Sequence, residues 1–120
     1  MPATIQHERD NIYRMDITGL LSKEEFDRCQ ESVVEQIQRL GTVRLLFVLS
    51  GFEGWERSPK WSDLNFYARY GDSIKRIAIV GDERWRNEAL MFAAADLRKA
   101  PVDYFSPESA IDEARAWLSR

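Results

Sequence analysis

The sequence contains little cysteine and histidine: its 120 residues include one of each, Cys29 and His7. A single cysteine cannot form a disulfide within the chain, and two such ligands do not make a zinc site of several histidines and cysteines. His7 falls on an expected edge strand and Cys29 on an apolar helical stripe, so we interpret both as structural. We expect no disulfide framework, no metal and no other cofactor.

Strong charge and long apolar runs are also absent. Seventeen lysines and arginines against twenty acidic residues leave a net charge of -3, which provides no positive field for nucleic acid. Apolar runs such as residues 45–49 are far shorter than the ~20 residues needed to cross a bilayer, and the first residues carry charges without a signal-peptide core. We therefore predict a cytoplasmic location, no nucleic-acid partner and no stable membrane insertion.

What is present suffices for one domain. With 44% hydrophobic residues, a chain of this length buries roughly two thirds of its unfolded surface. No internal repeat and no stretch rich in glycine, serine and proline marks a linker. We predict a single domain over residues 1–120.

The apolar spacing predicts alternating strands and helices. Residues 3–7, 12–17, 43–49, 74–80 and 102–105 have strand character. Helical spacing of apolar residues follows Ser22, Ser58, Asp82 and Ser106, which are suitable N-caps, and Glu25 stands at the capping-box position after Ser22. Pro59 and Pro107 suit first helical turns, and we expect the helix that starts near residue 83 to reach residue 99. The order is strand, strand, helix, strand, helix, strand, helix, strand, helix.

This order predicts an α/β fold with a mixed, mostly parallel sheet and helices packed on it. Residues 43–49 are almost continuously apolar and should form an interior strand, whereas residues 3–7 should be an antiparallel edge strand. Loops after parallel strands gather at one edge of the sheet, so we expect any site among residues 18–21, 50–58, 81–85 and 105–107.

Several local strings occur in an order that resembles the SpoIIAA-like family. They are Arg44-Leu45-Leu46 running into Phe52-Glu53-Gly54-Trp55, then Trp61-Ser62-Asp63-Leu64-Asn65-Phe66, then Arg76-Ile77-Ala78-Ile79-Val80 with Asp82 and Trp85, and Ala114-Arg115-Ala116-Trp117-Leu118. The resemblance implies a STAS-type fold, related in shape to anti-sigma-factor antagonists, with no known catalytic activity and no required cofactor. Those antagonists carry a phosphorylatable serine in a short Asp-Ser or Asp-Thr type motif that this sequence lacks. We interpret Ser58 as a helix cap and not as a phosphate switch.

Acidic and glycine residues give weak signals for chemistry. Glu53, Asp63 and Asp82 could converge at the sheet edge for acid–base work or for a hard metal ion. Capping by Asp82, a favourable helix dipole at Asp63 and solvation of Glu53 explain the three residues more simply. The glycines match no phosphate-binding pattern.

The aromatic residues are more informative. Trp61, Trp85 and Trp117 fit the inner stripes of helices, whereas Phe52 and Trp55 stand in an expected loop, residues 50–58. Exposed aromatic residues often anchor interfaces, so this pair is either a contact surface or a lid folded over the sheet. The contact hypothesis predicts that truncating Trp55 changes stability by less than ~1 kcal/mol.

Two hypotheses of function follow. The first is a non-enzymatic, regulatory domain that acts through contacts with another protein or with a second copy in a homodimer. The alternative is a domain that binds a small apolar ligand or lipid under Trp55, Trp61, Phe66 and Trp85. An enzyme using the three carboxylates ranks third. The candidate contact or ligand residues are Phe52, Glu53, Trp55, Ser58, Trp61, Asp63, Asp82 and Trp85.

Overall fold

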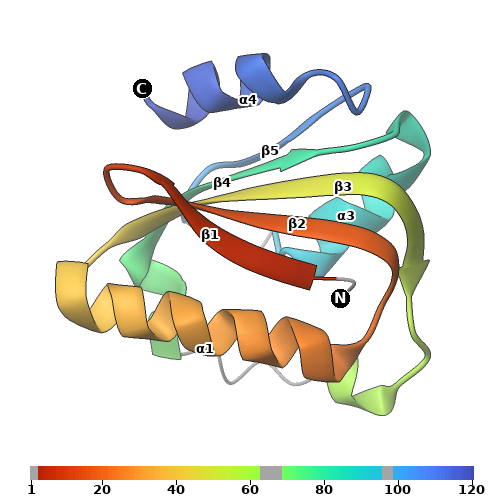
Figure 1. The fold of residues 1–120 in the computed structure, drawn as a ribbon, viewed down its shortest axis with the longest axis horizontal. Coiled ribbons are helices and arrows are strands. Elements are labelled where there is room, and N and C mark those ends of the chain that lie inside the picture. Colours follow the sequence, from red (N-terminus) through yellow and green to blue (C-terminus); the bar gives the residue numbers. More distant parts are fainter. Residues whose placement is uncertain (1–2, 63–68, 96–98) are drawn as a thin grey trace.

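The computed structural model describes residues 3–62, 69–95 and 99–120 (Figure 1). The strands are β1 (Ala3–Arg9), β2 (Ile12–Leu21), β3 (Val43–Trp55), β4 (Ile74–Val80) and β5 (Val102–Phe105). The α-helices are α1 (Lys23–Leu40), α3 (Arg86–Phe92) and α4 (Ile111–Leu118). Short 3-10 turns occupy Pro59–Ser62, Gly71–Ser73 and Glu83–Trp85.

The strands form one sheet in the order β1-β2-β3-β4-β5. β1 is antiparallel to β2, with Ala3 opposite Ile17, and the remaining neighbours are parallel. The predicted mixed, mostly parallel α/β fold is therefore confirmed, with residues 3–7 in an edge strand and residues 43–49 in the middle of the sheet.

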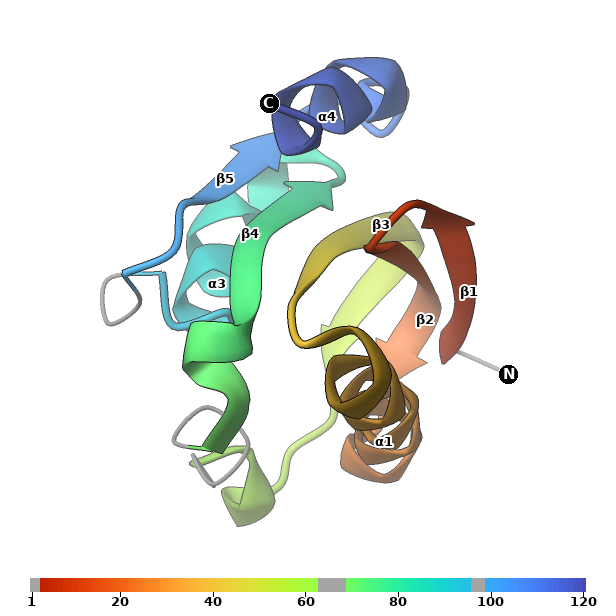
Figure 2. The ribbon, with the colours of Figure 1, turned by 90° about the vertical axis from the view of Figure 1, so that its left-hand side faces the viewer.

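The alternation of side chains along β3 divides the core into two layers. Leu45, Phe47 and Leu49 pack toward α1 and α3, while Leu46 and Val48 pack toward α4. Figures 1 and 2 show α1 and α4 on opposite sides of the sheet. Because both faces of the central strand are covered, its sequence is almost continuously apolar.

Helix α1 forms as its sequence predicts. The Ser22 hydroxyl accepts a hydrogen bond from the Glu25 amide at 3.1 Å, and Gly41 ends the helix with φ 90°. The Glu25 carboxylate does not complete a capping box, because it accepts from the Ala3 amide and so ties α1 to β1. Cys29 is buried in the apolar stripe; burial, with a smaller effect of the Glu25 carboxylate, raises the pKa of its thiol.

The predicted loop at residues 50–58 is wrong for its first half, because β3 continues to Trp55. Gly51 and Gly54 adopt φ values of 56° and 102°, which side-chain-bearing residues rarely tolerate. These conformations produce bulges in the pairing and still let Leu21 of β2 stand opposite Trp55. The glycines that suggested a loop thus bend a long strand.

Two predictions about later helices are also wrong. The helix expected up to residue 99 ends at Phe92, and Ala94 just beyond it has a positive φ of 55°. Ser106 does not cap the last helix, because α4 begins only at Ile111 and the Ser106 hydroxyl donates to Glu83 Oε1 at 2.6 Å. Most of the helix expected after Ser58, including Leu64 and Ala68, lies outside the described residues.

Gly81, directly after β4, lies against the side chain of Tyr104 in β5. A Cβ atom at Gly81 would stand 2.6 Å from the Tyr104 hydroxyl oxygen and 3.1 Å from Leu49 Cβ. The Tyr104 hydroxyl cannot retreat without loss, because it donates a 2.6 Å hydrogen bond to the Asp82 carbonyl. We therefore expect Gly81→Ala to lower the free energy of unfolding by about 2 kcal/mol in urea titrations.

A double-mutant cycle identifies the source of that strain. In a Tyr104→Phe background the nearest atom is gone, so the penalty of Gly81→Ala should fall by about half. An equal penalty in both backgrounds would show that the close contact with Tyr104 is not the cause.

Candidate functional site: an apolar cavity beneath Trp55

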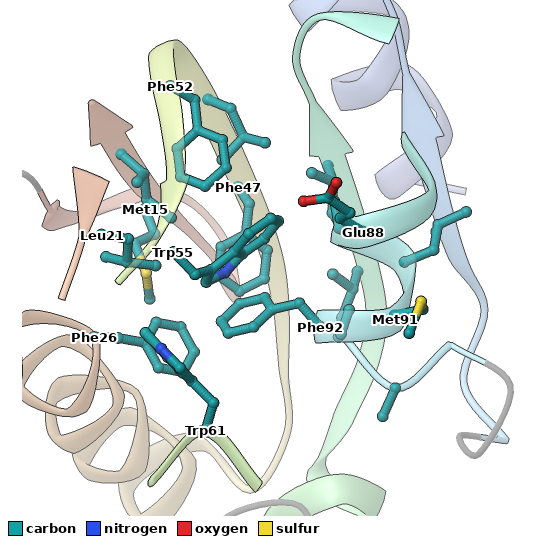
Figure 3. A pocket seen from close by; sticks show the side chains of 18 of the residues that line it. Met15, Leu21, Phe26, Phe47, Phe52, Trp55, Trp61, Glu88, Met91 and Phe92 are labelled. Carbon is teal, nitrogen blue, oxygen red and sulfur yellow. The ribbon is translucent and has the colours of Figure 1, made fainter. Parts of the chain in front are cut away.

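A cavity of about 890 Å³ lies between the sheet, α1 and α3 (Figure 3). Its walls come from the sheet face that carries Phe47 and Leu49, from α1 through Phe26, and from α3 and the residues after it. A volume of this size is in the range of about 300–1,000 Å³ typical of small-molecule sites. Other lining residues are Met15, Ile17, Leu21, Trp61, Ile77, Ile79 and Leu90.

Aromatic rings crowd one end of this cavity. The Phe92 ring stands 4.8 Å from that of Phe26, 5.5 Å from Trp61 and 5.3 Å from Trp55, measured between centroids. Phe52 continues the cluster with an edge contact to Trp55 at 4.9 Å. These rings come from four separate elements, so the aromatic wall exists only in the folded chain.

Few polar groups reach the cavity. The Lys23 ammonium forms an ion pair with Asp27 and lies 5.7 Å from the centroid of a Trp61 ring. Trp61 donates its indole hydrogen to the Glu56 carbonyl at 2.7 Å. The indole nitrogen of Trp55 is buried and has no hydrogen-bond partner among the described residues.

The two aromatic residues of the expected contact loop turn inward. Phe52 is buried, with 8% of its surface exposed, and Trp55 is partly buried and packs against the core. The contact-surface alternative is therefore wrong for Phe52, and both rings line the cavity as the lid alternative described. The two bulges, which leave Gly51 and Glu53 without a partner residue in β2, accompany this inward orientation, which the sequence pattern alone did not reveal.

The structure separates the other predicted residues. Trp61 lines the cavity, whereas Trp85 is not among the lining residues and packs edge-on against Phe52 at 5.0 Å. Glu53 is exposed, and Asp63 and Phe66 lie outside the described residues. The Ser58 carbonyl accepts from the Trp61 amide at 3.3 Å, but the side-chain cap by Ser58 stays a prediction.

The carboxylates do not form a metal site in the described part of the chain. Asp82 is an N-cap, as predicted, and its carboxylate accepts from the Arg84 amide at 2.9 Å. Within residues 3–62, 69–95 and 99–120, no group of three or more His, Cys, Asp or Glu side chains is arranged to hold a metal ion. His7 is on the edge strand, where its Nε2 donates to the Asp10 carbonyl at 2.7 Å.

Two shifted pKa values near Asp82 have structural causes. Hydrogen bonds from Arg86 and then Ser106 lower the pKa of Glu83 to about 2. Burial raises the pKa of Tyr104 to about 12, with a further contribution from the Asp82 carboxylate. Because these groups bond to one another and to the β5 backbone, we interpret them as tying the turn after β4 to β5.

Sequence reasoning missed most of the cavity's sheet wall. In the sequence, Met15, Ile17, Phe47 and Leu49 have the pattern of ordinary core residues. The signal in the sequence was the alternation of apolar residues in β2 and β3, which places one apolar face of the two strands opposite α1 and α3. That signal cannot tell a filled core from one that leaves space.

The five-stranded mixed sheet with helices on both faces defines an α/β domain, and the apolar cavity lies on one of these faces. The family model described as SpoIIAA-like matches residues 12–119, and the chain belongs to that family. A solved structure is similar in fold: an uncharacterized protein from the DUF3478 family with a SpoIIAA-like fold, from Shewanella loihica PV-4. The two chains share 19% identity with a TM-score of 0.71, over 97% of this chain and 91% of the other.

No curated protein matches the sequence. Among the described residues, none of the helices combines the length and apolar character needed to cross a membrane.

Proposed function

We propose that this domain is a binding protein for a small apolar ligand, held between the sheet, α1 and α3. The observation that carries the proposal is the cavity of about 890 Å³ with predominantly aromatic and aliphatic walls. An open pocket of this size lined by apolar groups makes fewer dispersion contacts than a filled core and leaves part of its apolar wall in contact with water. A ligand with apolar surface restores those contacts and leaves water at the same time.

The polar groups on the wall are few, as expected for a site that orients a ligand rather than transforms it. Lys23 is paired with Asp27, and the other polar lining residues of the described wall are Gln30, Asn87 and Glu88. We therefore propose binding without catalysis.

A variant that fills the cavity tests the proposal. Leu90 lines the cavity and is partly buried, so Leu90→Trp should occupy space that a ligand needs. We expect at least about a tenfold loss of affinity for the neutral fluorescent probe N-phenyl-1-naphthylamine, measured by titration. Thermal melting checks that the variant is folded.

The matched control is the same substitution on an exposed leucine. Leu40 is 41% exposed at the end of α1 and does not line the cavity, so Leu40→Trp should bind the probe as the wild type does. Failure of the wild type to bind any apolar probe, or equal affinity in the two variants, would contradict a ligand site in this cavity.

The protein-contact hypothesis has weaker support. Its proposed anchors, Phe52 and Trp55, pack inside the domain, and the exposed side chains of residues 50–58 are those of Ser50, Glu53 and Arg57. None of these three is aromatic, and the aromatic pair that would have supplied the buried contact area faces the core. Native mass spectrometry distinguishes the two hypotheses, because it separates a ligand-bound monomer from a homodimer.

A further inference from the structure

We infer that the ligand carries an uncharged oxygen acceptor, such as an ester or ketone carbonyl, and that the indole N–H of Trp55 is its hydrogen-bond donor. This inference rests on the proposed function and specifies the chemistry of the ligand. The observation behind it is a buried donor in the wall of the cavity that has no partner in the described structure.

Buried donors are rarely left unpaired, because they lose their hydrogen bonds to water without replacement. The other indole donor in the wall of this cavity has the expected hydrogen-bond partner. Trp61 lines the same cavity, and its indole N–H is satisfied by the Glu56 carbonyl at 2.7 Å. Trp55 has the same donor in the same wall without an acceptor among the described residues, and the oxygen of a bound molecule would supply one.

The indole nitrogen of Trp55 is buried beside other aromatic rings. Figure 3 shows Trp55 beside Phe92, and the two rings are 5.3 Å apart between centroids. Phe92 is the last residue of α3 and is only partly buried. We expect a ligand oxygen to reach the indole nitrogen when the Phe92 ring turns aside.

The charges along the wall favour a neutral ligand over an anion. The ammonium of Lys23 is already neutralised by Asp27. Glu88 also lines the cavity and adds a carboxylate, which Figure 3 shows among the lining side chains. A ligand carboxylate would meet this negative charge without a free cation on the described wall to offset it.

The test compares three ligands in the wild type and two variants. Methyl octanoate carries the carbonyl, undecane has the same number of heavy atoms without it, and octanoate carries a charge; each is measured by displacement of N-phenyl-1-naphthylamine. Trp55→Phe keeps an aromatic ring but removes the donor. Trp61→Phe is the matched control, because it removes a lining indole whose N–H is already bonded.

The decisive quantity is the ratio of the affinities for methyl octanoate and undecane. We expect Trp55→Phe to lower this ratio about fivefold, the effect of one net hydrogen bond, and Trp61→Phe to leave it unchanged. Octanoate should bind the wild type more weakly than its methyl ester. A ratio equal in all three proteins, or tighter binding of octanoate, would overturn the inference while leaving the ligand site intact.

A measurement on the wild type alone keeps the inference testable if Trp55→Phe does not fold. In a 15N-labelled sample, the indole proton of Trp55 should move downfield with methyl octanoate and not with undecane, since hydrogen bonding deshields it. No difference between the two ligands overturns the proposed donor. If neither ligand binds at all, the proposed function fails instead.

Discussion

Replacing Leu46 with alanine is expected to lower the free energy of unfolding by about 4 kcal/mol. Leu46 lies in the middle of β3, is completely buried, and belongs to the core layer that contains Ala114 and Leu118 of α4. The substitution removes apolar contacts and leaves a void that the rigid sheet cannot close. Urea denaturation followed by circular dichroism measures the loss.

An exposed leucine provides the control for this prediction. Leu40 keeps 41% of its surface exposed, so Leu40→Ala should change stability by less than about 0.5 kcal/mol. Similar losses in the two variants would mean that the layer beneath α4 is not packed as described.

Replacing Trp55 with alanine is expected to lower the free energy of unfolding by about 3 kcal/mol, in contrast to the small effect that a surface loop predicts. Its ring contacts Phe52 at 4.9 Å, Trp85 at 5.9 Å and Phe92 at 5.3 Å between centroids. Truncation removes all three aromatic contacts and the area that the indole buries. Guanidinium denaturation curves of the variant and the wild type give the difference.

Trp55→Phe separates packing from hydrogen bonding in this prediction. It keeps a ring in the cluster and should lose only about 1 kcal/mol, because the indole N–H has no partner to lose among the described residues. A loss below about 1 kcal/mol for Trp55→Ala would show that this side chain lies at the surface and does not cover the cavity.

The sequence by itself determined the elements whose signals are local. The Ser22 cap and Gly41 bound α1, and the uninterrupted apolar run at 43–49 identified the central strand. The antiparallel edge strand expected at residues 3–7 is present as β1. These features depend on backbone propensity and on spacing within a few residues, so they can be read before the chain is folded.

Only the tertiary structure decided whether residues 50–55 form a loop or a strand. Glycines at 51 and 54 are equally compatible with a loop and with a bulged strand, and pairing with β2 selects the strand. That pairing turns Phe52 and Trp55 inward. Whether the space beneath them is filled depends on side chains from β2, β3, α1 and α3 that are distant in sequence, and the volume they leave is a property of their packing together.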